Sequence, residues 1–193
     1  MEHQANRYLG TRTVRNGIHI GRCEHCLAAS ILSFFILVAA AGIGQAQVMG
    51  EEAELDRLRA KAEDAMGNDD AEGAAMNMGR AALMAAQLGK RQTEPALRQV
   101  FKSTEHLYRS QEHGYRGLAL FRRAGGELPA SAGVCGSLQL AQLELQHAQE
   151  TLASSETPDR PGAVSPKLPA IRQTADDWAI VLASMMGEFR CPN

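Results

Sequence analysis

The sequence predicts an all-α protein of antiparallel helical hairpins or a small helical bundle, with about six helices after an N-terminal apolar segment. Two observations carry this prediction. From Glu51 onward apolar residues recur with the helical period of 3.6, without convincing strand alternation. Glycine and proline interrupt the periodic stretches at intervals that suit short connections.

Composition excludes several classes of protein. The 193 residues are 45% hydrophobic, 5% aromatic and 22% charged, and the formal net charge is −2. A disordered acidic chain, a collagen-like fibre and a disulfide-dense miniprotein would each show a different balance. The nearly neutral charge also argues against a nucleic-acid partner held by bulk electrostatics.

Residues 1–46 have the pattern of a signal peptide. Four arginines precede an uncharged stretch over residues 27–44, and the small residues Gly44 and Ala46 form an A-x-A-like site at its end. We therefore expect cleavage after Ala46. The alternative is an uncleaved single-pass membrane anchor, because the charge-free stretch is about long enough to span a bilayer.

Both alternatives predict the same orientation. The arginines precede the apolar stretch, and the acidic residues Glu51, Glu52 and Glu54 follow it, which places the N-terminus inside. We expect a periplasmic or secreted domain, or, with an uncleaved segment, an inner-membrane-anchored protein whose domain lies outside. The membrane would then be contacted only through the N-terminal segment.

Residues 47–153 are predicted to form the helical-hairpin domain. Its first helix, residues 51–66, has acids in the first turn, where the helix dipole favours them. The second helix, residues 71–88, is expected to have Asp69 or Asp70 as N-cap and to end at Gly89. Alanine dominates its apolar face, so a neighbouring helix can approach closely.

Three more helices are expected in this domain. One begins at Thr93-Glu94-Pro95, with Thr93 as cap, and runs to about Glu112 before Gly114 ends it. A shorter helix over 115–124 follows, and a long helix covers about 131–153.

The C-terminal part consists of a linker and one helix. Four prolines in residues 154–169 indicate an exposed linker, and residues 170–193 contain a helix over about 170–187 with an apolar stripe that must dock on the domain. Cys135 and Cys191 are the only cysteines of the exported part, so an oxidising compartment favours a disulfide between them. Cys23 and Cys26 form a CxxC, which by itself is a weak redox or zinc signal.

Residues 101–129 resemble a tetratricopeptide repeat. The residues at that family's aromatic, small and proline positions are Phe101, Tyr108, Gly117, Phe121, Ala124 and Pro129. The chain departs from the family pattern at Thr104 and Glu105, where a large apolar residue followed by a small one is usual. The resemblance implies stacked helical hairpins with a groove for peptides or partner proteins, and it implies no catalytic residue.

The leading functional hypothesis is an exported, non-enzymatic interaction or scaffold module that binds a protein or peptide partner. Aromatic residues and arginines dominate binding surfaces, which makes the candidate partner-binding residues Phe101, Tyr108, Tyr115, Arg116 and Arg122. Phosphate-binding, G-x-S-x-G and H-E-x-x-H motifs are absent from the sequence, so no catalytic residue and no cofactor are predicted.

The alternative hypothesis is a periplasmic helical bundle that binds a small molecule or a metal, with His106, His113 and His147 converging. Seven residues separate the first two histidines by about 10 Å along a helix, too far for a single ion. A site would therefore need ligands from another helix, and we predict no metal ligand from the sequence alone.

Overall fold

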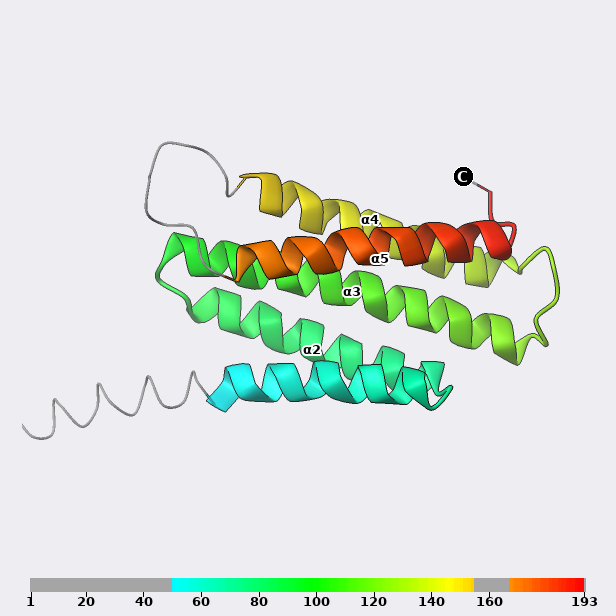
Figure 1. The fold of residues 1–193 in the computed structure, drawn as a ribbon, viewed down its shortest axis with the longest axis horizontal. Helices are drawn as coiled ribbons and strands as arrows, with labels where there is room; N and C mark the ends of the chain where they lie inside the picture. The colour runs from blue at the N-terminus through cyan, green and yellow to red at the C-terminus, as the bar shows by residue number, and fades with distance from the viewer. Residues whose placement is uncertain (1–49, 155–166, 193) are drawn as a thin grey trace, which may run out of the picture. The chain divides into compact units, whose positions relative to one another are not determined.

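A computed structural model describes residues 50–154 and 167–192, and these ranges confirm the all-α class (Figure 1). They contain a helix over residues 50–67 and four further helices, which are α2 (Ala71–Arg91), α3 (Pro95–Arg123), α4 (Ala132–Ser154) and α5 (Leu168–Glu188). The predicted signal peptide or anchor, residues 1–46, lies outside the described residues, as does most of the predicted linker. None of the helices in the described ranges combines the length and the apolar character that a membrane span requires.

Successive helices run in opposite directions, so that α2 packs on α3 and α3 packs on α4 (Figure 1). The C-terminal helix α5 contacts both α3 and α4, in agreement with its expected docking. The helix over 50–67 adds Leu55, Leu58 and Ala62 to the same core. The long helix α3 therefore lies at the centre of the domain.

Alanine makes the close packing of α2 possible, as its sequence predicts. Ala74, Ala81, Ala82 and Ala85 are completely buried. The N-cap is Asp70, whose carboxylate accepts a hydrogen bond from the Gly73 amide at 2.8 Å. This contact satisfies one of the amide groups left free at the start of the helix.

Two glycines that we expected to end helices lie inside them instead. Helix α2 continues through Gly89 to Arg91, and α3 continues through Gly114 to Arg123, so the separate helix over 115–124 does not exist. Both glycines are buried contact points: a Cβ at Gly89 would lie 3.2 Å from Cβ of Phe101, and one at Gly114 would lie 2.5 Å from Trp178. Close contact with a large side chain, rather than helix termination, explains these glycines.

Two predicted helix starts also need correction. The N-cap of α3 is Glu94 rather than Thr93, and no side chain caps this terminus, which begins with Pro95. Helix α5 begins at Leu168, so Pro169 belongs to its first turn rather than to the linker. Proline is well suited to both places, because the first turn of a helix does not need its missing amide hydrogen.

The predicted disulfide is present. The sulfur atoms of Cys135 and Cys191 lie 2.03 Å apart and join the first turn of α4 to the residues that follow α5. A backbone hydrogen bond of 2.9 Å from the Ala130 amide to the Phe189 carbonyl reinforces the same junction. The C-terminal helix is thus held to the domain at its far end.

Candidate functional site

A groove lies over α3, between the helix over 50–67 and α5. Its volume is about 480 Å³, and most of its lining is apolar. Five buried residues of α3 form its base: Val100, Phe101, Thr104, Leu107 and Tyr108. A volume in the range of about 300–1,000 Å³ is typical of sites that hold a small ligand.

The two walls of the groove carry its polar groups. Glu52, Asp56 and Arg59 line it from the helix over 50–67. On the opposite wall α5 contributes the exposed Ala170 and Thr174. An ion pair of 2.6 Å between Glu52 and Lys167 joins the two walls. The groove therefore combines an apolar base with charged edges.

The structure brings two of the five candidate partner-binding residues into this groove, Phe101 and Tyr108. Tyr115 follows two turns later on α3 and packs edge-on against Trp178, with ring centroids 5.4 Å apart. Arg116 and Arg122 do not line the groove; they form ion pairs with Glu112 and with Asp69 of the same chain.

Burial changes the acidity of the two tyrosines. It raises the pKa of Tyr108 to about 12. The pKa of Tyr115 is also raised, first by burial and then by the nearby charge of Glu63. Both phenols therefore stay protonated at neutral pH and can act as hydrogen-bond donors.

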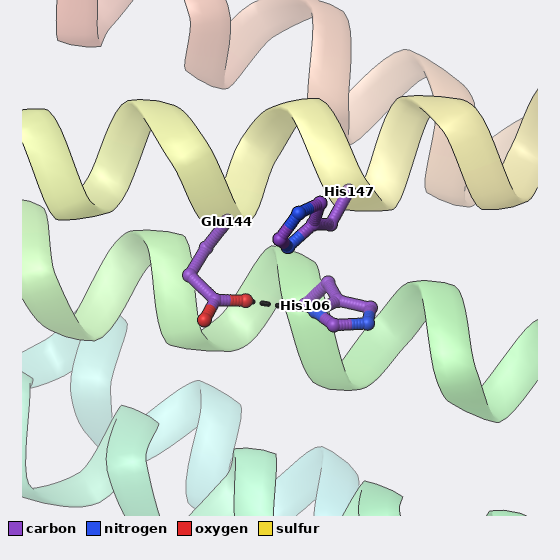
Figure 2. Close-up of side chains that lie close together, drawn as sticks. All are labelled: His106, Glu144 and His147. Carbon is purple, nitrogen blue, oxygen red and sulfur yellow. Dashed lines mark hydrogen bonds and ion pairs between the residues drawn. The ribbon is translucent and has the colours of Figure 1, made fainter.

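A second cluster of functional side chains joins α3 to α4. Figure 2 shows His106 of α3 facing Glu144 and His147 of α4. His106 Nδ1 lies 2.7 Å from a carboxylate oxygen of Glu144, and the two imidazole centroids are 5.3 Å apart. One ligand atom from each of the three residues lies within 4.8 Å of the other two. These three side chains are the ones in the described ranges that could hold a metal ion.

The third histidine of the predicted set, His113, is not a member of this cluster. Its Nδ1 atom is buried and has no hydrogen-bond partner in the described part of the chain. Burial lowers the pKa of this imidazole, so the neutral form is favoured.

No protein-family model, curated protein or solved structure matches this chain.

Sequence reasoning missed Glu144, although the sequence contains a signal for it. Glu144 precedes His147 by three residues, and this spacing places both side chains on one face of a helix. The same Glu-x-x-His spacing supplies metal ligands in helical bundles. The approach of His106 to this pair depends on how α3 and α4 align, which the spacing within one helix does not reveal.

Proposed function

We propose that the chain is an exported, non-enzymatic interaction module whose groove over α3 binds a short segment of a protein or peptide partner. The observation that carries the proposal is the apolar base of the groove, flanked by helices on both sides. The lining of the groove keeps some apolar surface accessible, and the hydrophobic effect favours its coverage by a partner.

The shape of the groove suits an amphipathic helix. Walls on both sides of α3 leave space for apolar side chains that recur on one face of a partner helix, the common helix-in-groove mode of recognition. Charged groups along the walls, such as Asp56 and Arg59, can contact the polar flanks of such a helix. Charge of this kind contributes to specificity more than to affinity.

Export is supported by two independent features. Disulfides persist mainly in oxidising compartments, and Cys135 and Cys191 form one. The sequence of residues 1–46 has the charge and hydropathy pattern of a targeting segment. Mass spectrometry of the protein recovered from cells distinguishes a chain that begins at Gln47 from an uncleaved, membrane-anchored one.

The groove is tested by a pair of matched substitutions. Helical peptides selected by display against the full chain are titrated against the wild type, Ala170→Arg and Ala183→Arg. Both alanines are exposed on α5, but only Ala170 lines the groove. An arginine at position 170 introduces bulk and charge at the wall, so we expect affinity to fall at least about tenfold, or about 1.4 kcal/mol.

The control variant Ala183→Arg should bind like the wild type. Equal affinity of both variants would show that peptides bind elsewhere and would contradict the proposal. A selection that enriches no peptide would contradict it as well.

A further inference from the structure

We infer that the cluster of His106, Glu144 and His147 binds a divalent transition metal ion such as Zn²⁺. This site is separate from the proposed groove. The three side chains come from two packed helices and converge on one point (Figure 2). Ligands around a tetrahedral zinc ion lie about 3.3 Å from one another, because each is about 2.0–2.1 Å from the metal. The present separations are at most 4.8 Å, so rotation of the side chains can bring the ligand atoms to that spacing.

The donor set selects the kind of metal. Two imidazole nitrogens and one carboxylate oxygen suit zinc and its neighbours among the transition metals. Calcium and magnesium prefer sites made only of oxygen atoms, so this set disfavours them. Three protein ligands leave one tetrahedral position for water or for a ligand from outside, as in zinc sites with two histidines and one glutamate.

The helices hold the ligands in a fixed alignment. Four residues after His106, the buried Ser110 donates a hydrogen bond of 2.7 Å to the carbonyl of Ala141, three residues before Glu144. Trp178 of α5 in turn donates to Ser110 at 2.8 Å. This buried chain of contacts sets the alignment of α3 and α4 about one turn from the cluster, and rigid support of this kind favours metal binding.

A hydrogen bond alone explains only part of the cluster. A hydrogen bond between His106 and Glu144 accounts for their distance of 2.7 Å. It does not account for His147, whose nitrogen lies within the same 4.8 Å. The side chains of His106 and Glu144 are 21% and 22% exposed, so an ion can reach them from solvent.

Metal binding to the full chain tests the inference. The protein is treated with a chelator, dialysed, and titrated with Zn²⁺ in a calorimeter and with Co²⁺ in a visible spectrometer. The background carries Cys23→Ser and Cys26→Ser, so that this CxxC cannot contribute thiolate ligands. We expect one Zn²⁺ per chain and the intense visible absorption of four- or five-coordinate Co²⁺, without thiolate charge-transfer bands.

Substitutions then assign the ligands. Removal of a residue that only supports a metal ligand lowers metal affinity about 10–100-fold. Removal of a ligand itself should cost at least as much, so we expect Zn²⁺ affinity to fall at least about tenfold in each of His106→Gln, Glu144→Gln and His147→Gln. The matched controls are His113→Gln on α3 and Glu150→Gln on α4, which should bind like the background protein. Circular dichroism verifies that each variant is folded.

Two outcomes would overturn the inference. One is an absence of Zn²⁺ binding, together with a weak octahedral Co²⁺ spectrum. The other is binding that His106→Gln and His147→Gln leave unchanged while both variants remain folded, because the ion would then occupy another part of the chain.

Discussion

At the scale of single residues, the helical glycines show where local and tertiary requirements differ. Glycine inside a helix costs about 0.5–1 kcal/mol relative to alanine, so a sequence pattern indicates helix termination there. In the folded chain Gly89 and Gly114 are buried within α2 and α3, next to Phe101 and Trp178. A Cβ at Gly114 would clash with Trp178, and one at Gly89 would lie tightly against Phe101.

Gly114→Ala should destabilise the domain. The added Cβ would lie 2.5 Å from Cζ2 of Trp178, and overpacking of a core costs about 1–3 kcal/mol, more than the helical preference of alanine returns. The free energy of unfolding in urea, followed by circular dichroism, measures the change.

Gly136→Ala on α4 is the matched control, because a Cβ there meets nothing within 4 Å. It should leave stability unchanged or raise it by up to about 1 kcal/mol. If Gly114→Ala were as stable as Gly136→Ala, contact with Trp178 would not explain the glycine.

At the scale of the helices, α3 organises the domain through different faces. One face forms the base of the groove between the helix over 50–67 and α5, and another carries His106 toward α4. The completely buried Ser110 joins α3 to both α4 and α5. Its hydroxyl donates a hydrogen bond to the carbonyl of Ala141 and accepts one from the indole nitrogen of Trp178. One hydroxyl group therefore links three helices.

Ser110→Ala should cost about 1–3 kcal/mol in the free energy of unfolding. The substitution leaves the indole nitrogen of Trp178 buried without its acceptor, and an unsatisfied buried donor carries a penalty of this size. Denaturant unfolding followed by the fluorescence of Trp178, the one tryptophan of the chain, measures it.

Ser103→Ala is the control on the same helix. Ser103 is equally buried, but its hydroxyl donates only to the carbonyl of Gln99 within α3. Since alanine is the better helix former, stability should change little. Equal losses in the two variants would argue against a bridging role for Ser110.

At the scale of the whole molecule, the sequence predicts the features that depend on one helix alone, such as its apolar face and its cap. The alanine face of α2 and its cap Asp70 follow from periodicity and from the chemistry of a helix start. Gly114 and His106 depend on partners from α5 and α4, so their roles emerge only when the helices are packed. The helices and their buried faces could therefore be predicted from the sequence, whereas the candidate metal ligands could be predicted only in part.

The Cys135–Cys191 disulfide was also predictable, and it contributes to the attachment of α5. The two cysteines are 56 residues apart, and closing a loop of this length removes much of the freedom of the unfolded chain. We expect the double substitution Cys135→Ser and Cys191→Ser to lower the free energy of unfolding by about 2–4 kcal/mol.

The double cysteine substitution should lower stability most in α5, because the disulfide joins the residues after this helix to the start of α4. Amide hydrogen exchange is expected to accelerate most in α5 and least in α2, which does not contact α5. A reductant should give the wild type the same exchange pattern, while Cys23→Ser with Cys26→Ser should leave it unchanged. Uniform acceleration in all described helices would instead mean that the domain unfolds as one unit and that α5 has no separate dependence on the bond.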